Sequence, residues 1–410
     1  MRDARQGSGR RRVAYIMSRF PKLSETFVLY EILALEQLGI EVEIFPLVRE
    51  RERVIHREAE RLAQVAHHVG VPSWHLVAAQ WWWLRRRPRA YLGAWRAALR
   101  GNARSVRFFL RSLAVVPLAA AFARRMDELE VAHIHAHWAT HPALAAYVAS
   151  RLTGIPYSFT AHAHDIYVER PMLREKIGAA RFVVTISEFN RRFLTRLYGR
   201  AAAERLVVLH CGTDPSVFRP VASARPAPPT IVCVASLQPQ KGHRHLIEAC
   251  RILSEAAVDV RCLLVGEGDE RADLERRIRL AGLGDRIGLL GNQPRHRVIE
   301  LLGSAAIVAQ PSVVLPNGKM EGIPVALMEA LAMERPVIAT DISGVSELGE
   351  HEVTGLLVPP GDATALAAAI QRLIGDPELA RSLGAAGRRR VLESFNLQDN
   401  ARLLAERFFP

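Results

Sequence analysis

Short apolar runs alternate with helical stretches along the chain, and this alternation restricts the fold more than any other sequence feature. Because the runs are continuously apolar, they predict buried parallel strands joined by right-handed helical crossovers. The runs occupy residues 13–17, 41–45, 131–135, 156–160, 181–186 and 206–210 in the first half, and 230–236, 260–266, 286–291, 306–312, 335–340 and 355–360 in the second. The sequence therefore predicts an α/β protein with two parallel sheets.

A Pro/Ala-rich segment, RPVASARPAPP at residues 219–229, separates the two halves and is typical of a linker. We expect an N-terminal domain at residues 1–218 and a second domain at residues 230–393, because a chain of 410 residues is too long for one ordinary core. Both halves are predicted to be Rossmann-like, doubly wound domains that face a central cleft. Ligands bind such sheets at the carboxyl ends of the strands.

The positive charge of the chain is concentrated in one segment. Residues 61–126 hold twelve arginines and no Asp or Glu, whereas the whole chain has a net charge of +13. Five of the six tryptophans fall in the same segment: Trp74, Trp81, Trp82, Trp83 and Trp95. Arginine together with interfacial tryptophan favours a face, at about residues 74–125, that lies on an anionic membrane surface; a solvated face in an arginine-rich chain is the alternative. No nucleic-acid-binding motif accompanies the charge, so we expect no nucleic-acid partner.

The rest of the composition indicates a soluble protein. The longest uncharged apolar stretches, near residues 71–84 and 112–123, are shorter than the roughly 18 residues that a membrane span needs. The basic N-terminus runs into the first strand without the apolar core of a signal peptide. The four cysteines show no Cys-x-x-Cys spacing, which favours free thiols. We expect a cytoplasmic protein that associates peripherally with the inner face of the cytoplasmic membrane.

The segment QPSVVLPNGKMEGIPVALMEALA, which starts at residue 310, carries the strongest chemical signal. Pro324 suits the first turn of a helix, and Gly322 lets the backbone approach a ligand closely. The N–H groups at residues 323–326 then form an anion site for a diphosphate. Glu321 before the helix and Glu329 within it can reach a sugar hydroxyl pair and a ribose diol; a loop Glu and an exposed helix Glu without a ligand are the alternative.

In this setting the Glu-x7-Glu spacing resembles the retaining GT-B glycosyltransferases of family 4. The resemblance covers most of the chain and rests, in the second half, on KGHRHLIEA, LLVGEGDER, LLGNQP and ISGVSELGEHEVTGLLVPPGD. In the first half, FPKLSETFV, HIHAHWA and SFTAHAHDI are similar to exopolysaccharide transferases of the colanic-acid and amylovoran type. The resemblance implies a GT-B fold whose C-terminal helix, at about residues 394–410, packs back on the N-terminal domain.

The resemblance also implies a role for each matching residue. Lys241 would neutralise the donor diphosphate, Glu321 would hold the transferred sugar, and Glu329 would hold the nucleotide ribose. His162 would donate a hydrogen bond to the sugar or phosphate, with Asp165 nearby to orient it. The other donor-binding residues would be Gly291, Asn292 and Gln293 beside the base, Gly322, Ile323, Pro324 and Val325 at the helix start, and Ser343, Gly344 and Val345 beside the phosphates. A solvated lysine, a structural histidine and plain turn glycines are the alternatives.

A metal site is the less favoured interpretation of three histidines in the first half. His133, His135 and His137 alternate along one strand face, which is one way to build such a site. The family works without a metal, however, and no Asp-x-Asp motif is present. We therefore expect no metal and no cofactor: a lysine and a helix dipole would meet the diphosphate instead of a divalent cation.

Several further residues are assigned less specifically. In the loop at residues 18–26, Arg19 and Lys22 are candidates to meet an acceptor phosphate. Ser24 and Ser187 are each either a helix N-cap or a residue of the cleft.

Two positions depart from the family pattern. Ser236 stands where many members carry an arginine, so that a hydroxyl or another arginine would meet one phosphate charge. Glu334 stands where a glycine commonly ends the helix, and because a left-handed non-glycine residue costs about 1 kcal/mol, we expect the turn to be built differently.

The resemblance implies a retaining, metal-independent hexosyltransferase. It would use a UDP- or GDP-sugar and extend a lipid-linked oligosaccharide in exopolysaccharide or cell-envelope polysaccharide biosynthesis. The alternative from another class is a non-catalytic, membrane-docked GT-B scaffold protein of polysaccharide assembly. A GT-B epimerase, a phosphorylase and a nucleic-acid binder are weaker alternatives; the phosphorylase would need a pyridoxal lysine site that the sequence does not show.

Overall fold

The computed structural model describes residues 11–21, 26–50, 57–70, 72–221 and 227–410. The chain divides into two compact units. The first comprises Met1–Thr185, Arg191–Leu209 and Ala401–Pro410, and the second comprises Ile186–Asn190 and His210–Asn400. Residues 222–226 of the segment predicted as a linker lie outside the described residues.

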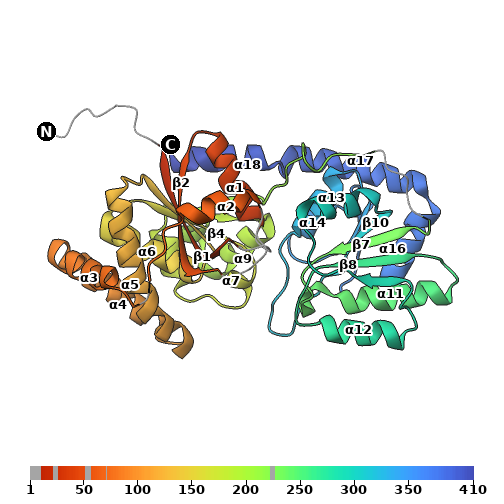
Figure 1. Ribbon diagram of the computed structural model, residues 1–410, viewed down its shortest axis with the longest axis horizontal. Coiled ribbons are helices and arrows are strands. Elements are labelled where there is room, and N and C mark those ends of the chain that lie inside the picture. Colours follow the sequence, from red (N-terminus) through yellow and green to blue (C-terminus); the bar gives the residue numbers. More distant parts are fainter. Residues whose placement is uncertain (1–10, 22–25, 51–56, 71, 222–226) are drawn as a thin grey trace. The chain divides into compact units, whose positions relative to one another are not determined.

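The first unit is built on a six-stranded parallel sheet (Figure 1). Its strands are β1 (Arg12–Phe20), β2 (Glu41–Arg49), β3 (His133–His137), β4 (Tyr157–Ala161), β5 (Phe182–Thr185) and β6 (Leu206–Val208), in the order β2-β1-β3-β4-β5-β6. Every residue of β3, β4 and β5 is buried, as the continuous apolar runs predict for strands covered on both faces. Val13 of β1 pairs with Val42 on one side and with His133 on the other.

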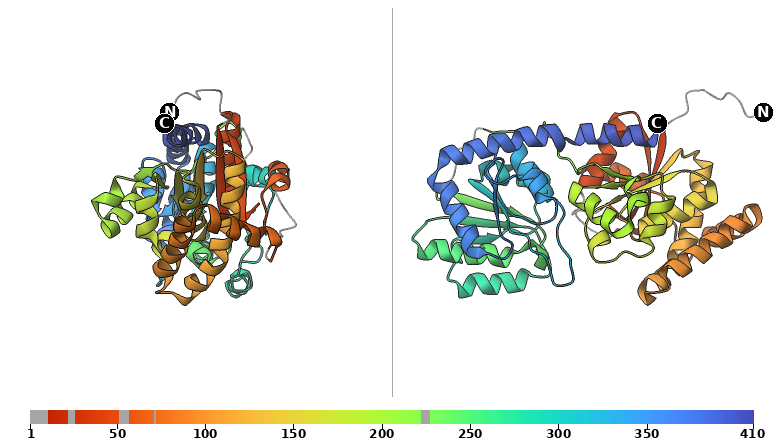
Figure 2. Two further views of the ribbon diagram at one scale, coloured as in Figure 1. Left: turned by 90° about the vertical axis from the view of Figure 1, so that its left-hand side faces the viewer. Right: turned by 180° about the vertical axis from the view of Figure 1, so that it is seen from behind.

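The helices of this unit pack around the sheet. They are α1 (Thr26–Gln37), α2 (Arg57–Val65), α3 (Trp74–Arg86), α4 (Pro88–Asn102), α5 (Val106–Glu128), α6 (His141–Thr153), α7 (His164–Tyr167), α8 (Leu173–Ala179), most of α9 (Glu188–Tyr198), α10 (Arg200–Ala203) and the end of α18 (Leu397–Phe408). Helix α6 packs on the sheet, α5 packs on α6, and α3 and α4 pack on α5, which leaves α3 and α4 outermost (Figures 1 and 2).

Helix α5 is long and apolar enough to cross a membrane by length and composition, which the uncharged stretch 112–123 alone did not predict. Half of its most apolar window is nevertheless buried inside this unit. Phe122 contacts Phe45 of β2, and the backbone carbonyl of Ala120 accepts a hydrogen bond from the indole of Trp83. A core helix of a globular unit has these properties.

The second unit contains another six-stranded parallel sheet. Its strands are β7 (Thr230–Val234), β8 (Arg261–Val265), β9 (Ile287–Leu289), β10 (Ile307–Gln310), β11 (Val337–Thr340) and β12 (Leu356–Val358), in the order β12-β11-β10-β7-β8-β9. Its helices are η1 (Pro239–Lys241), α11 (His243–Glu255), α12 (Arg271–Leu280), α13 (Arg295–Ser304), α14 (Val325–Ala332), α15 (Val345–Leu348), α16 (Ala363–Gly375) and α17 (Pro377–Ser394).

Two hydrophobic clusters cover the two faces of this sheet. Ile231 of β7 packs with residues of α11, α12 and α16, whereas its neighbour Val232 packs with residues of α13, α14 and α17. Figure 1 shows α11 and α12 on the opposite side of the sheet from α13 and α14. Because successive residues of a strand point to opposite faces, an apolar strand serves both clusters at once. The predicted fold class, two doubly wound Rossmann-like sheets, is confirmed.

The end of the last helix belongs to the first unit. Phe408 of α18 is buried there, and its ring lies 4.8 Å from that of His133 and 6.1 Å from that of Phe182, measured between centroids. The chain thus returns at its C-terminus to the sheet on which it began.

Candidate functional site

In the second unit, the connections diverge between two neighbouring strands, β7 and β10. After β7 the chain moves to β8, and after β10 it moves to β11, on the other side. Such a switch point leaves a crevice outside the carboxyl ends of the two strands, where open α/β sheets bind ligands. The loops that follow these strands, at residues 235–242 and 311–324, carry Lys241 and Glu321.

Lys241 and Glu321 form an ion pair across this switch point. The Nζ atom of Lys241 lies 2.5 Å from Oε2 of Glu321, and the side chains are 16% and 19% exposed. Gly242 holds the lysine loop against the other loop: its φ is +69°, and a Cβ atom there would collide with the carbonyl oxygen of Pro311. The structure thus brings together two residues that are 80 positions apart in the chain.

The helix after Glu321 begins one residue later than predicted. Pro324 is the N-cap residue of α14, with φ −64° and ψ 127°, and the helix itself begins at Val325. The first N–H groups of the helix have no acceptor within it. Gly322 and Ile323 lead into this cap, and the carbonyl of Gly322 accepts a hydrogen bond of 3.1 Å from the hydroxyl of Ser343.

Ser343 belongs to the loop that follows β11, and this loop ends beside α14. Ser343 has a left-handed φ of 49°, Gly344 is the N-cap residue of α15, and Val345 is its first residue. A Cβ atom at Gly344 would lie 2.6 Å from Cβ of Ser187, so a side chain there would displace the residue that begins α9. The three predicted phosphate-binding residues therefore lie in one tight turn next to Gly322.

Glu329 lies in α14 and is half-buried. Burial raises the pKa of its carboxyl group to about 7, while the nearby Arg295 acts in the opposite direction. A carboxyl group with this pKa changes its charge near neutral pH, so its hydrogen-bonding character depends on pH.

The predicted base-binding loop follows β9. Gly291 has a left-handed φ of +68°, and its carbonyl accepts a hydrogen bond of 2.9 Å from the N–H of Gly266. The side-chain amide of Gln293 donates to the carbonyl of Leu290 at 2.6 Å, whereas Asn292 is exposed. The side-chain amide of Gln293 is therefore already bonded to the backbone, and that of Asn292 is accessible.

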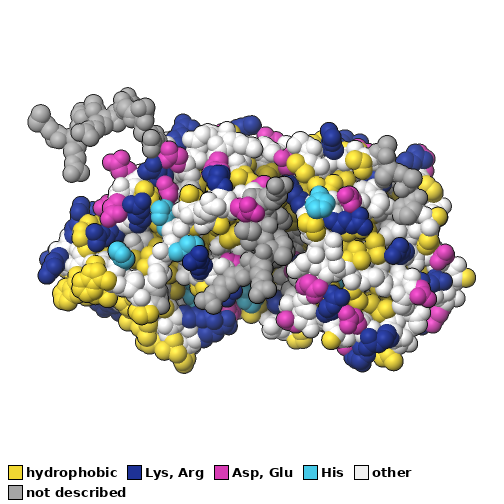
Figure 3. All heavy atoms as spheres, viewed as in Figure 1, with side chains coloured by type: hydrophobic (Ala, Val, Ile, Leu, Met, Phe, Trp, Pro, Cys, Tyr) yellow, Lys and Arg dark blue, Asp and Glu magenta, His cyan; other side chains and the backbone are white. Residues whose placement is uncertain are grey.

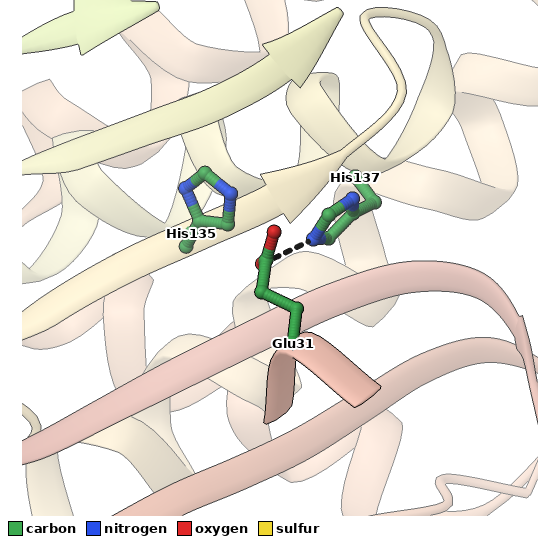
Figure 4. A group of neighbouring side chains, drawn as sticks. All are labelled: Glu31, His135 and His137. Carbon is green, nitrogen blue, oxygen red and sulfur yellow. Dashed lines mark hydrogen bonds and ion pairs between the residues drawn. The ribbon is translucent and has the colours of Figure 1, made fainter. Parts of the chain in front are cut away.

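In the first unit, His162 belongs to a chain of hydrogen-bonded polar groups. His162 follows β4. His137 is the last residue of β3 and Glu31 lies in α1 (Figure 4). Nε2 of His162 is 3.1 Å from Nδ1 of His137, and Nε2 of His137 is 3.0 Å from Oε1 of Glu31. Tyr15 of β1 donates its hydroxyl to the same carboxylate oxygen at 2.7 Å.

Glu31, His135 and His137 offer ligand atoms that lie within 4.8 Å of one another, which is the arrangement of a candidate metal site. Both ring nitrogens of the two histidines already have partners, however. The nitrogens of His135 lie 2.8 and 3.0 Å from the hydroxyls of Ser158 and Thr160. The group therefore forms a complete hydrogen-bond network by itself, and a metal would have to replace part of it.

Asp165 positions His162 through the backbone. Its carboxylate accepts the N–H groups of His162 at 3.1 Å, Ala163 at 2.9 Å and Ala139 at 2.7 Å. Burial raises the pKa of Asp165, and these N–H groups oppose the rise. Asp165 thus joins the loops after β3 and β4, and at His162 it binds the backbone N–H group and not the imidazole.

Aromatic and basic side chains form a patch on the outer helices of the first unit, which we call the Arg/Trp patch: Trp74, Ala78, Trp81, Trp82, Arg85, Arg86 and Arg124. These residues line an open groove of about 620 Å³. Trp74 is 77% exposed and Trp81 is 54% exposed, and hydrophobic side chains gather over α3 in Figure 3. The guanidinium group of Arg86 lies 4.7 Å from the ring centre of Trp82.

Not every residue of the basic segment contributes to this surface. Trp83 is buried, and its indole donates to the carbonyl of Ala120 at 2.8 Å. Some arginines pair with acids from outside the segment: Arg107 with Glu169, and Arg124 and Arg125 with Glu128. The absence of acids from the segment therefore overstates its free charge, because Glu169 comes from another part of the chain and Glu128 lies just beyond the segment in α5.

The acceptor-side candidates are described only in part. Lys22 and Ser24 lie outside the described residues. Arg19 lies 3.6 Å from Glu50 in an ion pair. Ser187 is an N-cap residue: its hydroxyl accepts the N–H of Asn190 at 3.1 Å, which selects the capping alternative.

Sequence reasoning missed Glu31 and Glu347. Glu31 shares the inward face of α1 with the buried Val28, Ile32 and Leu35, and a charge within an apolar helical stripe is a signal that could have found it. The carboxylate of Glu347 accepts the N–H groups of Glu188 and Phe189, each at 2.8 Å. No local pattern identifies Glu347, because its partners are about 160 residues away in the chain.

Comparisons with known proteins match both halves of the chain. Residues 24–217 match the family model "Glycosyltransferase Family 4", and residues 217–390 match "Glycosyl transferases group 1". The colanic acid biosynthesis glycosyltransferase WcaL of Escherichia coli is 30% identical over 96% of this chain and 98% of its own. The amylovoran biosynthesis glycosyltransferase AmsK of Erwinia amylovora is 39% identical, over 50% of each chain.

Solved structures share the fold over nearly the whole chain. A glycosyltransferase from Rickettsia africae has a TM-score of 0.72 at 20% identity and covers 97% of this chain and 98% of its own. Anabaena HepE in complex with UDP-glucose has a TM-score of 0.70 at 19% identity, with 96% and 98% covered. At these identities the likeness establishes the architecture alone.

Proposed function

The chain belongs to the glycosyltransferases, with a family 4 region followed by a group 1 region, and from this membership we propose that it transfers a hexose, with retention, from a nucleotide-diphosphate sugar to a growing lipid-linked oligosaccharide. The relatives named above act in the biosynthesis of exopolysaccharides, and we assign this chain to the same kind of pathway. A UDP- or GDP-sugar is the proposed donor.

The observation that carries the proposal is the Lys241–Glu321 ion pair at the switch point of the second sheet. A departing nucleoside diphosphate gains negative charge in the transition state, and the largely buried ammonium group of Lys241 would stabilise that charge once it has turned from Glu321 to the diphosphate. When the diphosphate takes over Lys241, the carboxylate of Glu321 becomes available to accept hydrogen bonds from hydroxyls of the transferred sugar. The ion pair thus holds both side chains at the switch point before the donor binds.

The neighbouring groups complete a donor site within the second unit. The N–H groups of Val325 and Ala326 at the start of α14 and the turn at residues 343–345 would bind the phosphates. Glu329 would accept hydrogen bonds from the ribose hydroxyls, and the loop at residues 291–293 would contact the base through its backbone. These groups bind a diphosphate through a lysine and helix N–H groups, so we propose that the reaction proceeds without a metal ion.

Thermal unfolding with candidate donors tests this proposal. The purified protein is heated with UDP, GDP, ADP and their sugars, with and without EDTA. A ligand at a hundred times its dissociation constant should stabilise the protein by about 2.7 kcal/mol. We expect one nucleotide to raise the melting temperature, with EDTA having no effect and Glu329→Ala abolishing the shift. Glu300→Ala serves as the control, because Glu300 is exposed on α13 and pairs with Arg297.

The outcomes separate the proposed enzyme from a scaffold protein. Nucleotide binding followed by release of UDP or GDP in the presence of an acceptor extract supports the transferase. If no nucleotide shifts the melting temperature, the donor site is wrong and the non-catalytic scaffold becomes the better interpretation.

We further propose that the Arg/Trp patch places the protein on an anionic membrane surface at the inner face of the cytoplasmic membrane, where lipid-linked acceptors reside. The support is the combination of exposed tryptophans with Arg85, Arg86 and Arg124 around one groove. Binding to phosphatidylglycerol-containing vesicles should exceed binding to phosphatidylcholine vesicles and decrease with salt.

A double variant and a matched control test this surface. Arg85→Glu with Arg86→Glu should weaken vesicle binding by at least about tenfold, since each basic residue near the membrane contributes about 1 kcal/mol. Arg276→Glu with Arg277→Glu makes the same change of charge on α12, where both arginines pair with Asp273. Equal loss of binding in both variants would refute a role specific to the Arg/Trp patch.

A further inference from the structure

The turn that we assign to the phosphates continues directly into the short helix that carries Glu347. The turn comprises residues 343–345, and α15 begins at Val345 and ends at Leu348. The N–H of Glu347 donates to the carbonyl of Gly344 at 3.0 Å. The turn and Glu347 therefore belong to one short, hydrogen-bonded segment, so that a contact which holds Glu347 also holds the turn.

Three hydrogen-bond donors anchor the carboxylate of Glu347. Its Oε1 atom accepts the N–H of Phe189 and its Oε2 atom accepts the N–H of Glu188, each at 2.8 Å. Nε2 of His210 lies 3.1 Å from Oε2, and because an ionised carboxylate can only accept, this nitrogen carries the proton. All four residues belong to the second unit, so the anchor lies within one compact part of the chain.

The surroundings of Glu347 favour its ionised form. Burial by itself would raise the pKa of this carboxyl group, but the hydrogen bonds from His210 and from the two N–H groups lower it below its ordinary value. Those N–H groups belong to the first two residues of α9. The first N–H groups of a helix have no acceptor within it and carry partial positive charge, so the carboxylate makes charge-assisted hydrogen bonds there.

Two further contacts hold the turn itself. The hydroxyl of Ser343 donates to the carbonyl of Gly322 at 3.1 Å, just before α14 begins. A Cβ atom at Gly344 would lie 2.6 Å from Cβ of Ser187, the residue that immediately precedes α9, so the turn packs directly on that residue. The turn is thus fixed both to the start of α14 and to residues 187–189.

We propose that Glu347 is a positioning residue for the donor diphosphate: its carboxylate ties α15 to the start of α9 and so keeps the turn at residues 343–345 in the conformation that binds the phosphates. This assignment rests on the proposed function, in which the turn meets the diphosphate. Both oxygens of Glu347 already accept hydrogen bonds, so the residue acts through the turn. A loop that is held in its bound conformation beforehand loses less conformational entropy on binding, which strengthens affinity.

Amide hydrogen exchange without ligand tests the anchor by itself. Glu347→Gln keeps the size of the side chain, but an amide has one acceptor oxygen and cannot accept at both ends. In this variant we expect faster exchange at the first two amides of α9 and in residues 343–349. Glu350→Gln is the control, because Glu350 lies in the next turn of chain and pairs with Arg390 at an exposed position. Unchanged exchange in Glu347→Gln would overturn the proposal.

A comparison of two ligands separates positioning from a general structural role. The nucleoside diphosphate identified by thermal unfolding should bind about tenfold more weakly to Glu347→Gln than to the wild type, the usual effect of one lost hydrogen bond. The matching nucleoside has no phosphates for the turn to bind, so its affinity, measured by ligand-observed NMR, should be unchanged. Equal weakening of both ligands, or of neither, would contradict the role of Glu347.

A second variant keeps the proposal testable if Glu347→Gln does not fold. His210→Phe retains an aromatic ring beside Phe395, whose ring centre lies 4.4 Å from that of His210, but removes one of the three donors to Glu347. The diphosphate should again lose affinity and the nucleoside should not. If the wild type binds no nucleotide, the proposed function fails and the role of Glu347 with it. If the wild type binds and the variants bind both ligands equally well, only the role of Glu347 fails.

Discussion

At the scale of single residues, the donor half of the site depends on Lys241, one of only four lysines in the chain. In a lysine-rich protein, a lysine at this position could be a coincidence. Here nearly all basic residues are arginines, so a coincidence is a poor explanation. The structure adds a reason for lysine. A compact ammonium group forms a single short contact with Glu321, and it can turn to a phosphate without the planar geometry of a guanidinium group.

Lys241→Met should lower kcat by about 10²–10³-fold, the usual cost of removing one group that stabilises transition-state charge. The apparent affinity for the nucleotide should fall less, because other groups also bind the phosphates. Single-turnover assays with the identified donor measure both quantities. Arg276→Met is the control, since Arg276 pairs with Asp273 on an exposed helix surface. A kcat within threefold of the wild type would contradict the role of Lys241.

Glu329 should make nucleotide binding dependent on pH. Its pKa of about 7 means that the carboxylate that accepts ribose hydroxyls forms only as the pH rises through neutrality. We expect the affinity of the wild type to increase from pH 6 to pH 8, and Glu329→Gln to lose this increase and bind about tenfold more weakly at pH 8. Calorimetric binding measurements on both proteins isolate the contribution of Glu329. The nucleotide phosphate also changes its protonation with pH, but it does so equally in the two experiments.

The same raised pKa affects stability with a definite sign. The folded protein keeps the proton of Glu329 up to about pH 7, whereas the unfolded chain loses it near the ordinary value of 4.5. Between these values the folded state binds more protons, so this residue makes the free energy of unfolding fall as the pH rises. Glu329→Gln removes this contribution, and an unchanged slope in that variant would contradict the pKa.

At the scale of elements, the end of α14 corrects one sequence expectation. Glu334 was expected to avoid a left-handed conformation, but its φ is 57°. The N–H of Arg335 donates to the carbonyl of Ala330, and that of Glu334 to Leu331, both at 2.9 Å, which is the Schellman arrangement. The backbone of Glu334 also touches α17, since a Cβ atom at Gly384 would collide with its carbonyl. The hydrogen bonds that end the helix therefore outweigh the tendency of a glutamate to avoid a left-handed φ.

Glu334→Gly should stabilise the protein by about 1 kcal/mol, because glycine adopts this conformation without strain. Only a weak ion pair, with Arg388 at 3.9 Å, would be lost. Denaturant unfolding measures the change. Ala256→Gly serves as the control at a comparable helix end with an ordinary φ of −81°, and it should destabilise or have no effect. Destabilisation by Glu334→Gly would show that the ion pair matters more than the strain.

At the scale of the whole molecule, the second unit collects its donor-binding groups from loops that lie far apart in sequence. The segments at residues 235–242, 291–293, 311–324 and 341–345 follow four different strands of one sheet. Parallel strands end at the same edge, so their loops gather there even though about a hundred residues separate the first from the last. The site is thus a property of the sheet and not of any one motif.

Hydrogen exchange should reveal this common edge. The nucleotide identified by thermal unfolding should slow exchange in all four segments together, and hardly in α12 or α16, which lie on the other face of the sheet from α14. Protection confined to one segment would contradict a shared site. The Glu329→Ala protein, in which the nucleotide-induced melting shift is expected to be lost, provides the control for ligand occupancy at the same nucleotide concentration.

The sequence by itself was enough to predict the fold class, the two sheets and the family. Continuous apolar strands, regular helical crossovers and the Glu-x7-Glu segment are local patterns, and each can be recognised in a short stretch of sequence. The loops that carry Lys241, Glu321 and His162 could be placed at strand ends for the same reason, because a strand and its following loop are consecutive in sequence.

Only the tertiary structure decided which side chains meet. The partners of Glu31 and Glu347 come from distant elements, and so does Glu169, the partner of Arg107 in the basic segment, so neither the hydrogen-bond line to His162 nor this ion pair has a local signature. The close approach of the Glu334 carbonyl to Gly384 of α17 likewise has no local signature. Local patterns fix where strands and helices form, whereas hydrogen bonds between side chains, burial and the resulting pKa values depend on distances that exist only once the sheets have assembled.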